Sequence, residues 1–282
     1  MIGKTRQPPE LEVSWDPSVG RARGVLLLPP TSGKFKHLRR APATDLACWI
    51  DHYWIVSWDL RGSEPYPIET LPHPNVQLVI EESGSRISGV HTRKFSRGLA
   101  GASQVFGVKF RAGTFRPFLG YAVSKLANRT IPATQVFGNE LHRLEEEALS
   151  ASSAESKIDL ANKFFLDGVP QLDPDANLAG KLVSMILDNA RIRTVDDLSA
   201  SAGMTKRMLQ RIFREYVGAT PKWVIRRSRL HELVEMANSG KSLDWAQVAL
   251  DLGYFDQAHL INDFRSIVGY TPGRYRSRIK GR

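Results

Sequence analysis

The side chains best suited to selective recognition lie in one short stretch near the C-terminus of this 282-residue chain. Arg207, Gln210 and Arg211 recur at helical spacing, so they share one face of a predicted helix. An arginine can donate two hydrogen bonds to guanine, and a glutamine amide can pair with adenine. This chemistry is recognition by hydrogen bonding, with no bond made or broken.

That stretch belongs to an internal repeat. Phe213–Pro221 and Phe264–Pro272 match at six of nine positions, and Leu209 and Leu260 continue the match 51 residues apart. Only two copies are present, so the repeat indicates one duplicated supersecondary unit and not a solenoid.

The first copy has the pattern of a helix–turn–helix. Val195 begins a short helix, Gly203 ends it, and Thr205 caps a second helix through its hydroxyl oxygen. Gly218 ends that second helix. Its inner face is apolar at helical spacing and consists of Leu209, Ile212, Phe213 and Tyr216.

The second copy repeats this order. Asp244 or Ser242 begins a helix, Gly253 breaks it and Asp256 caps the next. The matching inner stripe is Leu260, Phe264 and Ile267. Two such units in tandem favour DNA binding over plain helical packing.

A long helix is expected between the two units. Pro221 suits a first helical turn, and Lys222–Asn238 contains no glycine or proline. These residues would span about 25 Å, enough to hold two recognition helices near the ~34 Å repeat of one DNA turn.

The segment from Leu178 to Arg278 resembles the DNA-binding domain of the AraC/XylS family of bacterial transcription regulators. The matching residues are Gly203–Thr205, Leu209–Phe213, Gly218–Pro221, Gly253–Leu260 and Gly269–Pro272. The resemblance implies an all-α domain in which each unit inserts one helix into the major groove. Ser199 departs from the alanine usual at its position.

Two sets of contact residues follow from the residues and this resemblance. The expected base-contacting residues are Lys206, Arg207, Gln210, Arg211, Gln257, Ala258, His259, Ile261 and Asn262. The expected phosphate-contacting residues are Arg214, Lys222, Arg226, Arg227, Arg265, Arg274 and Arg276. The family usually has arginine where Asn262 stands, so the first helix is expected to supply most sequence discrimination.

The distribution of charge agrees with nucleic-acid binding. Of the net charge of +10, +8 falls from Leu178 onward, on the part expected to meet phosphates. Membrane binding is a poor alternative, because no basic amphipathic helix carries a broad aromatic face.

Several other classes of protein are disfavoured. The single cysteine, Cys48, excludes an intramolecular disulfide, and its apolar neighbours predict a small buried side chain. No apolar run is long enough to cross a bilayer or form a signal peptide. The protein is therefore expected in the cytoplasm.

The N-terminal half is predicted to be β-rich. Cys48–Trp58, Val76–Ile80 and Val105–Phe110 have the composition of strands. Helices are predicted at Val136–Leu149 and Glu155–Leu166. The fold class is thus α+β and multidomain: a barrel-like β domain with appended helices, then an all-α domain with two helix–turn–helix units.

The expected domain limits are a flexible tail (1–23), a sensor or dimerisation domain (24–167), a linker (168–177) and the DNA-binding domain (178–282). Pro72–Leu78 and Phe106–Gly113 resemble sensor-type domains of some AraC/XylS members. That resemblance implies effector recognition or dimerisation and names no effector.

No enzyme, metal or cofactor is predicted. The N-terminal histidines are scattered, without an H-x-H pair or an H-E-x-x-H helix, and no G-x-S-x-G elbow occurs. These histidines are His37, His52, His73 and His91. The aromatic residues Trp49, Tyr53, Trp54, Trp58 and Phe110 are expected in the core in preference to a ligand cage, although a ligand pocket inside such a barrel would be built from these residue types.

The expected partner is double-stranded promoter DNA. RNA polymerase, a small-molecule effector and a second copy of the chain stay open as further partners. Packing of Val136–Leu149 on its own sheet competes with a dimer interface, although a homodimer is favoured because one DNA-binding domain reads a short site. Two alternatives stay open: a front domain that binds a protein, and an enzyme with a DNA-binding tail.

Overall fold

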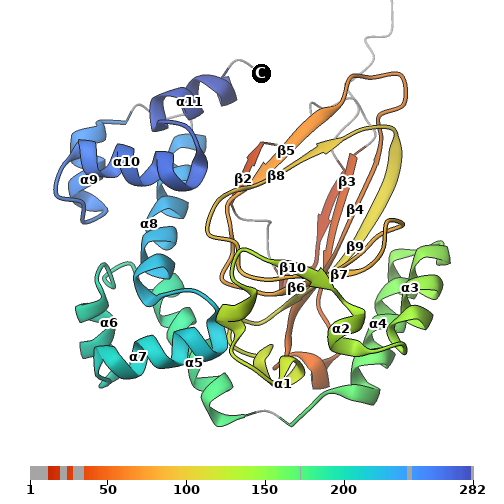
Figure 1. Cartoon of the computed structure of the whole chain (residues 1–282). Coiled ribbons are helices and arrows are strands. Elements are labelled where there is room, and N and C mark those ends of the chain that lie inside the picture. The colour runs from red at the N-terminus through yellow and green to blue at the C-terminus, as the bar shows by residue number, and fades with distance from the viewer. Residues whose placement is uncertain (1–11, 20–23, 28–34, 172, 240–242, 281–282) are drawn as a thin grey trace, which may run out of the picture.

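The chain folds into a β-rich N-terminal part followed by an all-helical C-terminal part (Figure 1). The computed structural model describes residues 12–19, 24–27, 35–171, 173–239 and 243–280. The strands are β1 (Glu12–Trp15), β2 (Val25–Leu27), β3 (Phe35–Arg40), β4 (Ile50–Asp59), β5 (Tyr66–Thr70), β6 (Gln77–Ile80), β7 (Arg86–Ser88), β8 (Phe95–Leu99), β9 (Ala102–Phe110) and β10 (Thr130–Pro132). The helices of this part are η1 (Thr44–Leu46), α1 (Arg116–Leu119), η2 (Val123–Leu126), α2 (Thr134–Phe137), α3 (Leu141–Ser150) and α4 (Ala154–Gly168).

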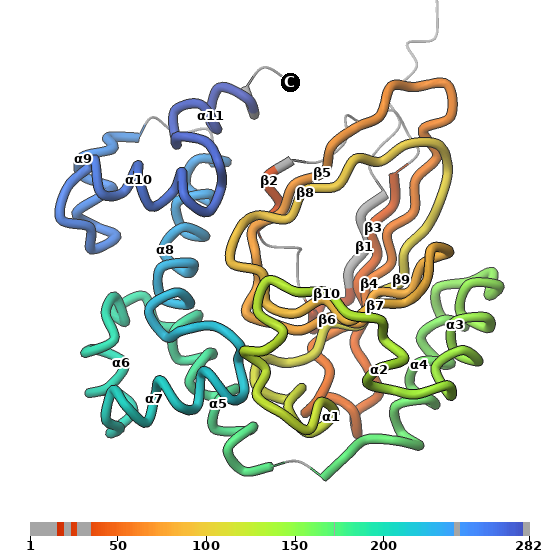
Figure 2. Tube along the Cα trace, in the orientation of Figure 1, coloured from red at the N-terminus to blue at the C-terminus, as the bar shows by residue number. Residues whose placement is uncertain are grey.

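Two sheets face each other in the N-terminal part (Figure 2). The larger has the order β1-β3-β4-β9-β6-β7-β10 and is antiparallel except between β1 and β3. The smaller is antiparallel, with the order β2-β5-β8. The β-rich domain with appended helices is confirmed. The barrel is not, because the described strands form two separate sheets and do not close.

Alternation along the strands gives the larger sheet two different faces. On β4, Tyr53 and Ile55 point into the main core, whereas His52 and Trp54 point toward the smaller sheet. The core face packs against α1 to α4 through a cluster of phenylalanine rings: Phe110, Phe115, Phe118, Phe137, Phe164 and Phe165. The helices thus cover one face and leave the other to line an interior space.

Most predicted N-terminal elements are present, with changes at their ends. Strands β4, β6 and β9 and helix α4 confirm four predictions. The helix predicted over Val136–Leu149 is interrupted, because Gly138 adopts a left-handed φ of 67° between α2 and α3. The apolar residues Leu141, Leu144 and Ala148 pack into the domain's own core.

Two expectations about the N-terminal part are wrong. Cys48 is exposed, because it lies in the turn before β4 and not within the strand. The flexible tail expected over residues 1–23 includes Glu12–Trp15, which pair with β3; residues 1–11 and 20–23 of that prediction lie outside the described residues.

The C-terminal part is helical throughout. Its helices are α5 (Pro174–Asp188), α6 (Val195–Ala202), α7 (Lys206–Ile212), η3 (Phe213–Val217), α8 (Pro221–Asn238), α9 (Trp245–Asp251), α10 (Gln257–Val268) and α11 (Pro272–Lys280). Helices α6–α7 and α9–α10 are the two helix–turn–helix units, joined by the predicted long helix α8. Of the expected linker 168–177, α4 takes the first residue and α5 begins at Pro174.

The turns of both units follow the predicted capping residues. Thr205 Oγ1 accepts from the Met208 amide at 3.3 Å, and Asp256 Oδ1 accepts from the His259 amide at 2.7 Å. Asp244 caps α9, accepting from the Ala246 amide at 2.9 Å; the alternative start at Ser242 lies outside the described residues. Local sequence therefore determines where these helices begin.

Candidate functional site

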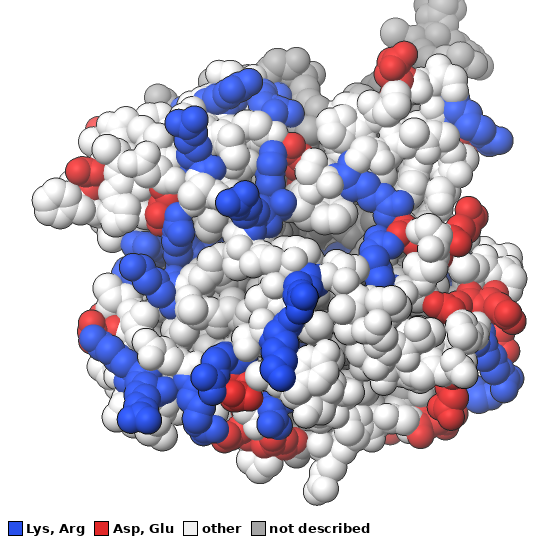
Figure 3. Space-filling view, viewed as in Figure 1, with Lys and Arg blue, Asp and Glu red and all other residues white. Residues whose placement is uncertain are grey.

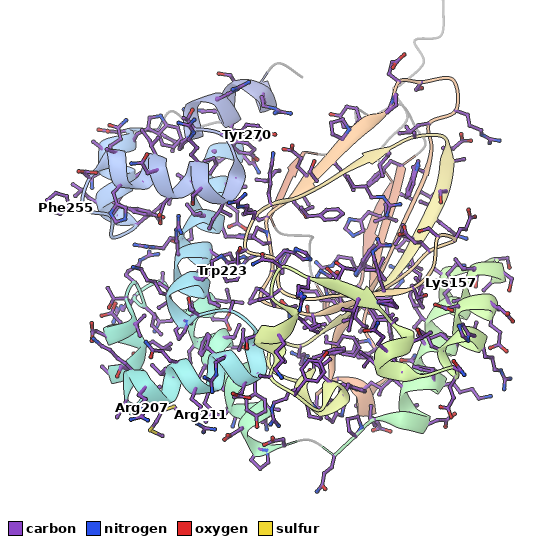
Figure 4. All side chains as sticks on the ribbon, viewed as in Figure 1. Lys157, Arg207, Arg211, Trp223, Phe255 and Tyr270 are labelled. Atoms are coloured by element: carbon purple, nitrogen blue, oxygen red, sulfur yellow. The ribbon has the colours of Figure 1, made fainter. Side chains whose placement is uncertain are left out.

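The outer face of α7 presents the first predicted contact set. Lys206, Arg207, Gln210 and Arg211 are all exposed, while Leu209 packs into the core beneath them. Figure 4 shows Arg207 and Arg211 at the outer edge of the molecule, pointing away from the β-rich part. These four side chains are therefore placed to meet a large polar partner from solvent.

Two of these cations form exposed ion pairs with carboxylates. Lys206 Nζ lies 2.5 Å from Asp196 Oδ1, and Arg211 Nη2 lies 3.2 Å from Asp175 Oδ2. Both pairs are exposed, and such pairs contribute only about 0–1 kcal/mol. Exchanging these carboxylates for nucleic-acid groups would therefore cost little.

Helix α10 presents a different surface. Gln257, Ala258, His259 and Asn262 are exposed, but Ile261 is half-buried against the core of its own unit. The exposed set holds no arginine or lysine, so α10 offers fewer strong hydrogen-bond donors than α7. The base contacts themselves stay predictions for both helices.

The predicted phosphate set divides by exposure. Exposed members are Arg214, Lys222, Arg265 and Arg274, and Arg276 is half-buried. Arg226 turns inward within the C-terminal part, where its Nη2 lies 2.7 Å from Asp263 Oδ1 on α10. It braces α8 against α10 instead of presenting a free cation to solvent.

The phosphate contact predicted for Arg227 is wrong for this arrangement of the chain. Its side chain is 5% exposed, Nε donates to Pro72 O at 2.8 Å, and Nη2 lies 3.0 Å from His73 Nδ1. Its positive charge and its place beside Arg226 and Arg229 on the long helix suggested the phosphate role. The side chain instead joins α8 to the N-terminal part.

Two N-terminal loops contact helix α8 of the C-terminal part. The loop between β5 and β6 meets α8 through Pro72 and His73. The loop between β7 and β8 meets it through Thr92, whose carbonyl accepts from Trp223 Nε1 at 3.2 Å. We call this contact region between the two loops and α8 the seam, and Figure 4 shows Trp223 within it.

A polar group extends the seam to the end of the second unit. Lys94 Nζ lies 2.7 Å from Glu69 Oε1, and Tyr270 OH donates to the same carboxylate oxygen at 2.5 Å. The Lys94 amide also donates to Ile267 O at 2.9 Å. Because these groups satisfy one another away from solvent, they fix the orientation of the two parts.

The surface charge matches this division of the molecule. On the face shown in Figure 3, basic side chains gather over the C-terminal helices and along the seam, whereas acidic ones gather over α3 and α4. On this face, positive charge therefore gathers over the part of the molecule that carries α7.

A cavity of about 360 Å3 lies between the two N-terminal sheets. Its apolar lining includes Trp54, Val56, Trp58, Ile68, Val79, Leu99 and Val105. Its basic lining is His37, Arg39, His52, His73, Arg86, His91, Arg93, Arg97 and Lys109. No aspartate or glutamate occurs among the described lining residues.

The strand register places polar lining residues toward one end of the cavity and apolar lining residues toward the other. His52 pairs with Lys109 across β4 and β9, Trp54 with Gly107, and Val56 with Val105. The Trp54 indole lies over Gly107, where an added Cβ would come within 2.0 Å of the ring. The cationic end thus lies beside His73 and the seam, and the apolar end lies farther along the strands.

Burial changes the pKa values of the titratable side chains at the polar end of the cavity. It lowers the pKa of His52 to about 4, outweighing the hydrogen bond from His52 Nδ1 to Asp51 Oδ2 at 2.9 Å. It also lowers the pKa of Lys109, and burial together with the Lys109 and Arg227 charges lowers that of His73 well below its usual value. Although burial opposes it, the hydrogen bond from His52 holds the pKa of Asp51 below its usual value.

The structure thus brings together four histidines that the sequence leaves scattered. His37, His52, His73 and His91 all line the cavity. Within the described ranges, however, no three His, Cys, Asp or Glu side chains are grouped so that they could hold a metal.

The aromatic residues expected in the core divide between two roles. Trp49, Tyr53 and Phe110 pack in the main core, and Trp54 lines the cavity. Trp58 does both, because it is buried in a smaller core cluster and also lines the cavity. Alternate residues of β4 and β9 carry the signal that could have identified the cavity, but it could be read only once the second sheet was in place.

The described helices include none long and apolar enough to cross a membrane.

Comparison with known proteins separates the two parts. A helix-turn-helix domain family (HTH_18) matches residues 198–278, and a domain of unknown function (DUF6597) matches residues 38–132. The RCS-specific HTH-type transcriptional activator RclR of Escherichia coli (strain K12) is 31% identical over 87 residues, which are 31% of this chain and 30% of that protein. The HTH-type transcriptional activator AarP of Providencia stuartii is 31% identical over 83 residues, 29% of this chain and 61% of AarP. Each alignment spans less than two thirds of the relative.

Two solved structures resemble the chain distantly. ToxT from Vibrio cholerae O395 is 12% identical with a TM-score of 0.38, covering 77% of this chain and 90% of ToxT. Wild-type ToxT from Vibrio cholerae strain SCE256, bound to an unsaturated fatty acid, is 12% identical with a TM-score of 0.37, covering 76% and 87%. These scores are too low to establish a shared fold.

Proposed function

We propose that this chain, whose C-terminal domain is a helix–turn–helix domain of the AraC/XylS type, is a sequence-specific DNA-binding transcription regulator controlled by a small molecule. The observation that carries the proposal is the outer face of α7. Its exposed Arg207, Gln210 and Arg211 stand on a helix whose opposite face is fixed in the core, which is the arrangement that a recognition helix requires.

Helix α8 supports a two-site footprint. It runs from Pro221 to Asn238 and carries one unit at each end. The side chains of Arg226 and Asp263 fix its angle to α10. Two recognition helices held rigidly apart would bind successive turns of the major groove on one side of the duplex.

The seam supports control by a ligand. Pro72 and His73 line the cavity and also bind Arg227 on α8, and the loop carrying His91 and Arg93 continues into the contacts of Lys94. A molecule that binds the cavity and shifts either loop changes the contacts that orient the DNA-binding domain. Such a ligand alters DNA affinity only through a difference in its affinity for the two arrangements.

The cavity also weighs against a front domain that only binds another protein. Such a domain would be expected to have a filled interior and an exposed apolar patch, whereas this one has a cavity lined by converging polar groups. The relatives are regulators, which disfavours the enzyme alternative. We place the regulator in the cytoplasm, with RNA polymerase as its partner at the promoter.

A homodimer stays part of the proposal without an assigned surface. Within the stretch Val136–Leu149, for which a dimer interface was one alternative, Leu141, Leu144 and Ala148 pack inside their own domain. Sedimentation of the full chain at tens of micromolar decides the oligomeric state.

Selection of bound fragments from random DNA tests the proposed function. The full chain should enrich one motif, and Arg207→Ala should lower affinity for that motif while leaving affinity for scrambled DNA little changed. The matched control is Lys222→Ala, an exposed cation on α8 that should weaken both DNAs alike. Failure to enrich any sequence, with and without candidate ligands, would remove the proposal.

A further inference from the structure

The unusual feature of the cavity is the chemistry of its polar end. Lys109 Nζ lies 3.3 Å from Asp51 Oδ2, and only 13% of the lysine side chain is exposed. Asp51 also accepts from His52, so one carboxylate serves both groups. A buried ammonium group that shares its carboxylate is costly unless a further negative charge approaches it.

The cations elsewhere in the cavity are better neutralised. Arg97 Nη1 lies 2.6 Å from Glu81 Oε2, and Arg86 binds the other oxygen of the same buried carboxylate. Around Lys109 the neighbours are Arg39, which donates to His52 Nε2 at 3.1 Å, and Arg227 behind His73. Arg39 and Arg227 have further partners of their own, yet their charges and that of Lys109 depress the pKa values of neighbouring histidines. The field at this end is therefore positive.

At the opposite end, Arg97 lies over the Trp58 ring, with its guanidinium carbon 5.6 Å from the ring centroid. Because Arg97 is paired with Glu81, this end would suit an uncharged group. Val56, Trp58 and Val105 lie there on the paired strands, and the Trp54 indole lies between the two ends. A volume of about 360 Å3 falls in the usual range for small-molecule sites.

We propose that this cavity binds a small organic anion, with a carboxylate, sulfonate or phosphate group at Lys109, beside Arg39, and an apolar, flat body against Trp54 and Val105. This assignment rests on the proposed function, because it names the chemical class of the controlling ligand. It also gives a role to a basic lining inside a domain that has no proposed contact with DNA.

A matched pair of fluorescent probes tests the ligand class on the full chain. 1-Anilinonaphthalene-8-sulfonate carries the anion, and N-phenyl-1-naphthylamine has the same aromatic body without it. The sulfonate should bind at one site and roughly tenfold or more tightly than the amine, because a hydrogen bond to a charged group is that strong. Equal affinities, tighter binding of the amine, or no binding of either probe would overturn the assignment.

Variants locate the site. Lys109→Met keeps the length of the side chain and should weaken the sulfonate roughly tenfold without affecting the amine. Lys125→Met, at an exposed lysine on η2, is the matched control and should change neither. Val105→Trp fills the apolar end and should weaken both probes. If Lys109→Met fails to fold by circular dichroism, Arg39→Gln provides the same comparison; sulfonate binding that survives the charge variant or Val105→Trp contradicts the site.

DNA binding is measured separately in the same preparations. If the chain shows no preference for the anion but still binds DNA sequence-specifically, the proposed ligand class is wrong and the proposed regulatory function stands. An intact anion preference in a chain that selects no DNA sequence would remove the proposed function and leave the anion site.

Discussion

The two parts of the chain carry positive charge in opposite settings. On α7, Arg207 and Arg211 extend into solvent from a packed helix. In the β-rich part, Lys109 and His52 point inward from paired strands, and His52 is 4% exposed. Exposed charges are screened by water and salt, whereas buried charges respond to desolvation and to their immediate neighbours.

Because of this difference, the C-terminal part should respond to salt and the N-terminal part to pH and to ligands. The outer cations should govern how tightly and where the chain binds a polyanion, and their contribution should vary with salt. The inner groups should govern stability against pH and the choice of ligand. The seam, where Arg227 enters the N-terminal part, connects the two.

The largest expected effect concerns pH. The pKa of His52 falls from 6.5 to about 4 in the folded chain, so the folded state disfavours the protonated ring. Stability from this group is complete above pH 6.5 and is lost as the pH falls toward 4, by up to about 3 kcal/mol. Urea unfolding followed by tryptophan fluorescence at pH 7, 6 and 5 measures this loss.

The His52→Gln variant should reduce that dependence without abolishing it, because glutamine does not titrate in this range, whereas burial also lowers the pKa values of His37 and His73. His142→Gln, at an exposed position on α3, is the matched control and should leave the dependence as it is. A wild-type chain equally stable at pH 7 and pH 5 would contradict the inward placement of His52.

The next effect concerns base reading. Arg211→Ala should cost about 1–3 kcal/mol on the selected site and relax preference there, whereas Asn262→Ala should cost less, because the base-contacting set predicted on α10 holds no arginine or lysine. Footprinting and affinity measurements on selected and scrambled DNA give both values. A greater loss of specificity for Asn262→Ala would reverse the proposed division between the two units.

The smallest effect separates two cations of one helix. Lys222 is exposed and Arg227 is buried on α8. Lys222→Ala should therefore reduce the slope of log affinity against log salt by about 0.9, as expected for one lost phosphate contact. Arg227→Ala should leave the slope nearly unchanged and act on the seam instead. A salt series on both variants tests the contrast, and equal losses of slope would return Arg227 to the phosphate set.

Local patterns made the C-terminal domain predictable. Thr205 and Asp256 cap their helices through side chains a few residues from the amides they bind, and the left-handed turns at Gly203 and Gly218 need only local backbone geometry. The repeat then doubled each signal, so that the units, the connecting helix and the exposed faces could all be anticipated.

The cavity depends on pairings that local patterns do not contain. His37 and His73 come from β3 and from the loop after β5, and they share a cavity only because of the strand register and the opposing sheet. The burial of Arg227 likewise required docking of the two parts. Its sequence neighbours Arg226 and Arg229 gave it the appearance of one member of a basic surface.

The shared use of the two seam loops has a consequence for how such a protein could diversify. Substitutions at Pro72 or His73 that adapt the cavity to a new molecule would also alter the resting contact with α8, so ligand preference and basal activity would be inherited together. Val56 and Val105 lie on strands at the other end of the cavity. Substitutions there can change ligand preference without altering the contact with α8, and so without altering basal activity. Lineages and laboratory selections should accordingly accumulate change at that apolar end first.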